Sequence, residues 1–224
     1  MSAALAGLTL LVIGDSHFVT QGYLVTTLHE NLQRQGARVV TYGACGVAAG
    51  AWVSPRAVSC GTAQRIGNAA PRIDRSPQAR SWSIDELIRE HRPNAVIVGI
   101  GDPMAGYHQR ELPRGWITEE VRSLTLRLQA NNMPCIWVGP SWGTEGGPYF
   151  KTFARVREAA DFLSTQVAPC QFMDSTAMSR QGEWPTFDGQ HHTLPGYQRW
   201  GAALAQQIVV SPVIRQVQAQ LPRR

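Results

Sequence analysis

Leu8-Thr9-Leu10-Leu11-Val12-Ile13-Gly14-Asp15-Ser16-His17 joins an apolar run to a turn of small and polar residues. A continuous apolar run is typical of a strand that is buried on both faces of a parallel sheet. Ser16 follows directly after the end of this strand, and ligands of open α/β sheets bind at the carboxyl edge of the strands. The stretch therefore predicts both the first strand of a parallel sheet and a candidate functional serine at its edge.

The rest of the chain repeats this pattern of apolar runs followed by helical periodicity. We expect strands at 8–13, 38–42, 95–100, 135–139 and 170–173, and helices at 22–35, 83–91, 117–131, 149–167 and 195–209. Strands that are each followed by a helix predict an α/β protein, a three-layer α/β/α sandwich with a five-stranded parallel sheet. Right-handed crossovers place every strand's carboxyl end at one edge. We expect a single domain over residues 1–224.

Residues 56–80 interrupt the alternation of strands and helices. They contain five arginines, a single acidic residue, two prolines and few bulky apolar residues. The segment predicts an ordered insertion or a mobile loop. As a solvated surface loop it needs no function, whereas as a basic rim it would attract an anionic polymer or partner. The extension at about 211–224 predicts one more short helix.

Composition excludes several classes of protein. With 224 residues, 43% of them hydrophobic, the chain can bury one sizeable core. Its basic residues, all arginine except Lys151, are scattered and do not form the basic stripe of a nucleic-acid groove. No run reaches the ~18 apolar residues of a membrane span, so we expect no stable membrane insertion. The adjacent His191 and His192 do not converge easily on one ion, and we expect no metal and no cofactor.

The four cysteines indicate in which cellular compartment the protein is found. Cys45 and Cys60 bracket a Gly/Ala-rich loop, and we predict a disulfide there; Cys135 and Cys170 each follow a proline at the start of a predicted strand and are expected to be neighbours. Four buried thiols are the alternative. A disulfide favours a periplasmic or secreted protein, with the cytoplasm as the alternative. The first residues lack a signal peptide, but an exported chain without its leader would look the same.

Asp188 and His191 supply the groups that a nucleophilic serine needs. A serine hydroxyl must pass its proton to a base, normally an imidazole that a carboxylate orients. Asp188 and His191 lie three residues apart in a predicted turn before the last helix, at the same sheet edge as Ser16. The pattern predicts Ser16 as the nucleophile, His191 as the base and Asp188 as the orienting carboxylate. The alternative for Ser16 is a helix N-cap.

Gly14-Asp15-Ser16-His17 resembles the first block of the SGNH (GDSL-type) hydrolase superfamily, and the stretch from Asp188 to Tyr197 resembles its last block. Tyr42-Gly43-Ala44-Cys45-Gly46 is similar to the glycine block, with Cys45 where a serine is common. The resemblance implies a flavodoxin-like sheet. It also implies a serine esterase, a lipase, or a carbohydrate O-acyl hydrolase or transferase.

The resemblance implies an oxyanion hole in which one donor is in doubt. The family uses the N–H of the nucleophile, the N–H of the glycine block and an Asn side chain, of which Ser16 and Gly46 can supply the first two. The third block reads Gly99-Ile100-Gly101-Asp102, so Gly101 stands where the family has Asn. Loss of one donor lowers the rate by a factor on the order of 10²–10³. The candidates to replace it are Asn68, Arg56, Arg65 and the N–H of Gly101.

Five further side chains are candidates for substrate binding: Trp52, Trp142, Trp184, Asp102 and His17. Trp52 follows the glycine block, Trp142 follows the fourth predicted strand, and Trp184 precedes Asp188. Their flat faces suit sugar rings or apolar acyl chains. The alternatives are ordinary packing for the tryptophans and a loop-capping carboxylate for Asp102. His29, His91 and His108 are expected at the surface or behind the site.

We predict a serine esterase that removes or transfers short acyl (acetyl) groups on carbohydrate, as in the modification of bacterial exopolysaccharides. Its partners would be an acylated carbohydrate or small ester and other polysaccharide-modification proteins. The alternatives are a non-catalytic carbohydrate-binding or assembly protein on the same fold and a short-chain lipase or thioesterase.

Overall fold

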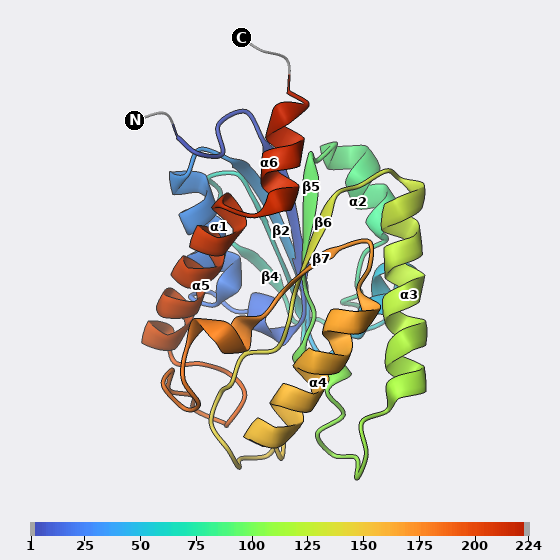
Figure 1. Ribbon diagram of the computed structural model, residues 1–224, viewed down its shortest axis with the longest axis vertical. Helices are drawn as coiled ribbons and strands as arrows, with labels where there is room; N and C mark the ends of the chain where they lie inside the picture. Colours follow the sequence, from blue (N-terminus) through green and yellow to red (C-terminus); the bar gives the residue numbers. More distant parts are fainter. Residues whose placement is uncertain (1–2, 222–224) are drawn as a thin grey trace.

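The computed structural model describes residues 3–221, in which a central sheet lies between two layers of helices (Figure 1). The sheet has seven strands in the order β4-β3-β2-β1-β5-β6-β7. They are β1 (Thr9–Gly14), β2 (Arg38–Ala44), β3 (Thr62–Ile66), β4 (Arg72–Asp74), β5 (Ala95–Gly99), β6 (Cys135–Val138) and β7 (Gln171–Met173). The five predicted strands are all present, and they pair in parallel, which confirms the predicted α/β/α class.

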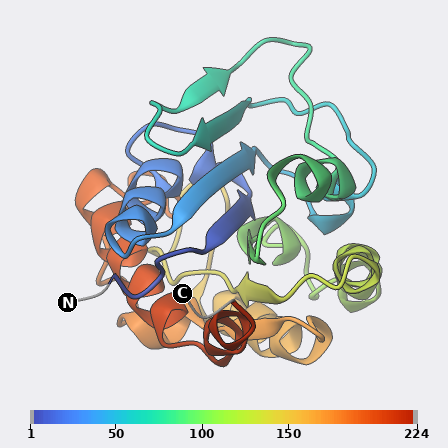
Figure 2. The same cartoon turned by 90° about the horizontal axis from the view of Figure 1, so that it is seen from above.

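The helices cover both faces of the sheet, as Figure 2 shows from above. One face carries α1 (Leu24–Arg34), α5 (Leu194–Val209) and α6 (Pro212–Ala219), and the other carries α2 (Ile84–His91), α3 (Arg114–Ala130) and α4 (Phe153–Gln166). Short 3₁₀ helices are η1 (Ser16–Phe18), η2 (Ala49–Trp52), η3 (Asp102–Met104) and η4 (Ser175–Met178). All the predicted helices are present, including the one in the extension at 211–224. Residues 222–224 of this extension lie outside the described residues.

Helix α4 begins later than its periodicity predicts. Its first residue is Phe153, and the side chain of Thr152 caps it by accepting a hydrogen bond from the N–H of Arg155. Residues 149–151 therefore belong to the loop before the helix. This loop contributes to the candidate site.

The alternating side chains of each parallel strand enter two separate cores. In β1, Leu11 and Ile13 point into the core under α2, α3 and α4, whereas Leu10 and Val12 point into the core under α1, α5 and α6. All four side chains have no exposed surface. Burial on both faces explains why this strand is continuously apolar.

The segment 56–80 contains a pair of strands. β3 pairs antiparallel with β2, and β4 pairs antiparallel with β3. Arg65 lies in β3 with its side chain buried, and its guanidinium bonds to Glu30 of α1 at 2.9 Å and to the carbonyl of Ala69 at 2.9 Å. Part of the arginine charge that suggested a basic rim is therefore used to hold this insertion against α1.

Two disulfides are present among the described residues, Cys45–Cys60 and Cys135–Cys170. The first was predicted. The second joins the start of β6 to the residue before β7, where the two cysteines were expected to be neighbours. The alternative of four thiols is wrong, since the described residues contain no free cysteine.

The carboxyl ends of the parallel strands meet at the lower end of the molecule in Figure 1, opposite α6 and the first described residues. Ser16 follows β1 here, and Asp102 follows β5. Among residues 3–221, no helix has both the length and the apolar character that crossing a membrane requires.

Candidate active site

Ser16 lies at the start of η1, immediately after β1. The turn requires glycine at position 14, because a Cβ there would lie 2.0 Å from the ring of Phe18. The residue that caps η1 is Asp15, whose carboxylate accepts a hydrogen bond from the N–H of His17 at 3.0 Å. Asp15 therefore performs the capping that was the alternative role for Ser16, and the Ser16 hydroxyl is available for another partner.

That partner is His191, which the loop before α5 brings to Ser16 from 175 residues away in the sequence. His191 Nε2 lies 2.8 Å from Ser16 Oγ, and His191 Nδ1 lies 2.7 Å from Asp188 Oδ2. The other carboxylate oxygen of Asp188 accepts hydrogen bonds from the N–H groups of Gln190 and His191. The structure thus aligns the three residues that the two sequence motifs predicted.

The protonation states of Asp188 and His191 follow from burial and hydrogen bonding. Burial, together with the adjacent His17, lowers the pKa of His191, although Asp188 opposes this shift. Burial alone would raise the pKa of Asp188, but the hydrogen bonds from the ring and backbone of His191 lower it. At neutral pH the carboxylate accepts the Nδ1 proton, and Nε2 is left to accept a proton from Ser16.

A cavity of about 240 Å³ opens over Ser16 and His191. Its lining is Ser16, Cys45, Gly46, Cys60, Asp102, Pro103, Gly106, Tyr107, His108, Tyr149, Gln190 and His191. The N–H groups of Ser16 and Gly46 have no protein acceptor within residues 3–221, so both can donate to a ligand in the cavity. Gly46 has a φ of +70°, which favours glycine at this position.

The structure excludes Gly101 as the third donor. Its N–H already donates to Asp15 Oδ2 at 3.3 Å. A Cβ at this position would lie 2.6 Å from the backbone nitrogen of Pro140, so no side chain fits without a backbone shift. Within the described part of the chain, the cavity lining also includes no Asn or Arg side chain, which excludes the other three candidates, Asn68, Arg56 and Arg65.

Asp102 and His17, both candidates for substrate binding, form a buried polar network. Lys151 Nζ lies 3.0 Å from both oxygens of Asp102, and the side chains of this ion pair are fully buried. His17 Nε2 lies 2.8 Å from Asp102, and its Nδ1 lies 2.8 Å from the hydroxyl of Tyr197. Tyr107 donates its hydroxyl to Asp102 at 2.6 Å. Asp102 touches the cavity, but its oxygens are already used by protein donors.

The charge state of Asp102 follows from Lys151. Burial alone would raise the pKa of Asp102, but the Lys151 ammonium and the hydrogen bond from His17 hold it well below its usual range. Burial and the Asp102 charge raise the pKa of Tyr107 well above its usual value, so its hydroxyl stays a donor. Lys151 was missed in the sequence, where its being the chain's only lysine was the one available signal.

None of the three predicted tryptophans lines the cavity. Trp52 is fully buried in the core beneath α3, and Trp184 is buried against His192. Trp142 is half-buried, and its N–H donates to the carbonyls of Thr176 and Ser179. Packing, the alternative explanation, accounts for all three, because each ring faces the protein interior or a neighbouring loop.

Other aromatic rings surround His191 instead. Ring centroids of Tyr149, Phe187 and Tyr23 lie 5.5, 5.9 and 6.1 Å from that of His191. Sequence reasoning missed all three. Phe187 directly precedes Asp188, so its position beside the last motif was the available signal. His108 lines the cavity, whereas His29 and His91 are buried, each with a hydrogen-bond partner.

The sequence is 43% identical over 207 residues to Protein BcsX of Komagataeibacter xylinus. The matched stretch covers 92% of this chain and 78% of BcsX. The chain belongs to the BcsX family. No family model matches it.

Solved structures place this BcsX-family chain within a wider fold. A lipolytic protein of the G-D-S-L family from Desulfitobacterium hafniense superimposes with a TM-score of 0.60 at 14% identity, covering 89% of this chain and 99% of that chain. A catalytic mutant of an acetylxylan esterase from Geobacillus stearothermophilus gives a TM-score of 0.57 at 17% identity, over 91% and 94% of the two chains. The fold is that of the SGNH hydrolase superfamily, as the motifs predicted.

Proposed function

We propose that the protein is a serine esterase that removes or transfers short acyl groups, acetyl above all, on carbohydrate. One observation carries the proposal. The Asp188–His191–Ser16 hydrogen-bond chain ends in a cavity where the N–H groups of Ser16 and Gly46 have no acceptor among residues 3–221. A nucleophile, its base and the donors for a developing oxyanion are thus supplied at one place.

The geometry supports a reaction in two halves. Ser16 Oγ attacks the ester carbonyl carbon while His191 Nε2 takes the hydroxyl proton, and the N–H groups of Ser16 and Gly46 bind the oxyanion. His191 then passes the proton to the departing sugar oxygen, and the acyl group stays on Ser16. In the second half, His191 activates water to release the acid, or a sugar hydroxyl to complete acyl transfer.

Asp102 would oppose the oxyanion if its charge were uncompensated, because it lies at the wall of the same cavity. The Lys151 ammonium, 3.0 Å away, balances that charge. With two backbone donors and no Asn, we expect turnover slower than that of a three-donor site by a factor on the order of 10²–10³.

Three observations support a carbohydrate ester as substrate. Aromatic rings border His191, and such rings suit the apolar faces of sugars. Acetylxylan esterases occur among the solved structures with this fold. The two disulfides favour a periplasmic or secreted protein, where extracellular polysaccharides are accessible.

Acetate release from an acetylated polysaccharide tests the proposal. We expect release by the unchanged protein, none above background by Ser16→Ala, and unchanged release by Trp116→Ala, whose side chain is exposed on α3 and does not line the cavity. A fluorophosphonate probe should label Ser16 in the folded protein. Absence of labelling in folded protein would favour the non-catalytic carbohydrate-binding alternative.

A short-chain lipase or thioesterase is the second candidate, favoured by the exposed side chains of Phe150, Phe187 and Leu194. Comparison of acetyl and octanoyl esters, with acyl-CoA as a third substrate, separates the two. Higher kcat/KM for octanoyl esters or acyl-CoA would replace the carbohydrate proposal with this one.

A further inference from the structure

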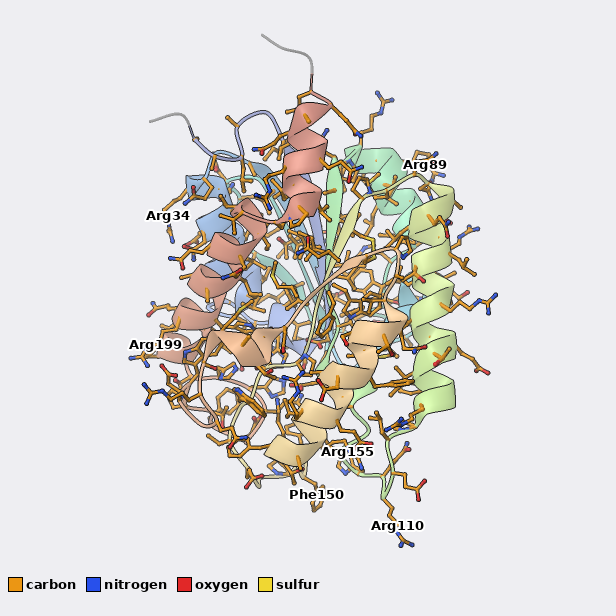
Figure 3. All side chains as sticks on the ribbon, in the orientation of Figure 1. Arg34, Arg89, Arg110, Phe150, Arg155 and Arg199 are labelled. Atoms are coloured by element: carbon orange, nitrogen blue, oxygen red, sulfur yellow. A yellow bond between two sulfur atoms is a disulfide. The ribbon has the colours of Figure 1, made fainter. Side chains whose placement is uncertain are left out.

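Exposed apolar side chains gather at the edge of the candidate site. Phe150 and Phe187 are each 62% exposed, and Leu194 is 53% exposed. Phe150 precedes α4, whereas Phe187 and Leu194 flank His191 in the sequence. Figure 3 shows Phe150 at the lower end of the molecule, pointing away from the protein body. Apolar side chains gathered beside a site are typical of a surface that binds a partner or substrate.

Ring contacts connect this edge across His191. Phe187 packs on His191 and on Tyr23, with ring centroids 5.9 and 6.5 Å apart. The ring centroid of Tyr149 lies 5.5 Å from that of His191, and the ring centroid of its neighbour Phe150 lies 5.1 Å from that of His108, which lines the cavity. We call Phe150, Tyr149, Phe187 and Tyr23 the aromatic row.

The aromatic row joins two depressions. At one end is the cavity over Ser16, and at the other is a depression of about 400 Å³ lined by Gln21, Gly22, Tyr23, Thr26 and Leu194. His191 lines the cavity over Ser16, and its ring contacts that of Tyr23, which lines the second depression. A ligand long enough to occupy both depressions would therefore pass over the Ser16–His191 pair.

The loops that carry the row are braced against each other. The N–H of Thr144 donates to the carbonyl of Gly189 at 3.0 Å, and Gly146 bonds to the carbonyl of Lys151 at 3.2 Å. Lys151 is in turn anchored by its buried ion pair with Asp102. The loop that carries Tyr149 and Phe150 is thus held by the network that lies behind the cavity.

Phe150 has an unusual backbone conformation for an exposed aromatic residue. Its φ is +56°, in the left-handed region that favours glycine. Gly146 and Gly147 lie close by and could adopt this conformation at less cost, yet Phe150 adopts it as well. Strained residues gather at functional sites, and the strain here holds a large apolar ring in solvent.

We propose that the aromatic row is a binding track for an extended polysaccharide chain, which crosses the candidate triad so that acyl groups are removed from, or added to, sugars within the chain. This inference rests on the proposed function and names its substrate class. Flat apolar faces next to hydrogen-bonding side chains, such as Gln190 in the cavity and Gln21 and Thr26 in the depression, suit a sugar chain. An alkyl chain would leave those polar groups without partners.

Chain-length dependence tests the track. We would measure kcat/KM for O-acetylated xylose, O-acetylated xylo-oligosaccharides of increasing length and acetylated xylan, with 4-nitrophenyl acetate as a small ester. The unchanged protein should gain about tenfold or more from the monosaccharide to the longer chains. Phe150→Ala and Phe187→Ala should each remove most of this gain, so that the ratio of polymer to small-ester kcat/KM falls. Trp116→Ala, an exposed aromatic on α3, should leave both values unchanged.

Affinity electrophoresis in a gel that contains acetylated xylan separates binding from catalysis. Ser16→Ala should be retarded, and the Ser16→Ala protein that also carries Phe150→Ala should be retarded less. Equal kcat/KM on monosaccharide and polymer, together with no retardation, would overturn the track. Octanoyl ester hydrolysis that depends on Phe150 and Phe187 would also overturn it, by assigning the row to an acyl chain. If the unchanged protein neither reacts with the fluorophosphonate probe nor hydrolyses the small ester, the proposed esterase is overturned. Retardation in the gel would still support the track.

Discussion

Lys151 and Asp102 form an ion pair that has no contact with solvent, directly behind the candidate catalytic cavity. Asp102 also accepts hydrogen bonds from Tyr107 and His17, so its carboxylate is well satisfied. A buried pair of this kind adds little stability relative to apolar residues, but removal of one member leaves a charge without compensation. At the scale of single residues, we therefore expect the protein to be sensitive to substitution of either member of this pair.

Substitution of Lys151 should destabilise the protein strongly. We expect Lys151→Met to lower the free energy of unfolding by about 3–5 kcal/mol, because Asp102 is left as an unpaired buried carboxylate. The double variant with Asp102→Asn should recover much of this loss, since both partners are then neutral. Urea unfolding at neutral pH measures both effects. A loss below about 1 kcal/mol for Lys151→Met alone would contradict the buried charge pair.

The acid limb of the pH–rate profile should report His191. The ring must be neutral to accept the Ser16 proton, and burial together with His17 lowers the pKa of His191 below its ordinary value of 6.5. A lowered pKa keeps the ring neutral to lower pH, so kcat/KM for 4-nitrophenyl acetate at pH 6.5 should exceed half of its plateau value. Below the His191 pKa it should fall by about tenfold per pH unit. A midpoint of the acid limb above 6.5 would contradict this assignment.

Among the elements, the two disulfides hold opposite ends of the sheet. Cys45–Cys60 ties the end of β2 to the start of β3 and borders Gly46, which lines the cavity. Cys135–Cys170 ties the start of β6 to the start of β7, away from Ser16. The two bonds therefore form a matched pair, in which only one is next to the candidate oxyanion donor.

Removal of each disulfide should separate stability from activity. Closing loops with separations of 15 and 35 residues should each contribute about 3–4 kcal/mol of stability by the chain-entropy account. We expect both Cys→Ala double variants to unfold at lower temperature. Only the Cys45/Cys60 variant should also lose kcat/KM on a small ester, because Gly46 is no longer held beside the cavity. Equal activity losses in the two variants would contradict a local role for Cys45–Cys60.

At the scale of the whole molecule, His29 and His192 are buried, and neither forms a salt bridge within residues 3–221. Burial lowers the pKa of His29 to about 4 and that of His192 to about 3. His29 joins three elements, since it bonds to Thr41 of β2 and to the carbonyl of Gly67 after β3. His192 bonds to Ser141 behind the active site. Both rings stay neutral in the folded protein at pH values where the unfolded chain would protonate them.

Stability should therefore fall as the pH falls below the ordinary histidine pKa of 6.5. Between that value and about 4, the unfolded state binds protons that the folded state does not bind at His29 and His192. Each group should contribute a slope of up to about 1.4 kcal/mol per pH unit. Urea unfolding over this range measures the slope, and His29→Gln should reduce it. Stability that stays constant from neutral pH to pH 4 would show that the rings are not buried as neutral groups.

Local pattern was sufficient for most of the elements. The five parallel strands, the helices and the two motifs around Ser16 and His191 could be predicted because each depends on residues that are close in sequence. Continuous apolar runs indicate burial on both faces of a sheet, and the sheet then brings all the strand ends to one edge. The same reasoning brought Asp188, His191 and Ser16 to one place, where the structure aligns them within hydrogen-bonding distance.

The sequence by itself determined the class of fold and which residues could form a Ser–His–Asp arrangement. Only the tertiary structure decided that Trp52 is core, that Lys151 neutralises Asp102, and that residues 62–74 extend the sheet with two antiparallel strands. It also decided that Tyr23, Tyr149 and Phe187, and not the tryptophans, surround His191. The physical reason is that burial, charge pairing and ring packing depend on contacts between distant segments, which local periodicity does not encode.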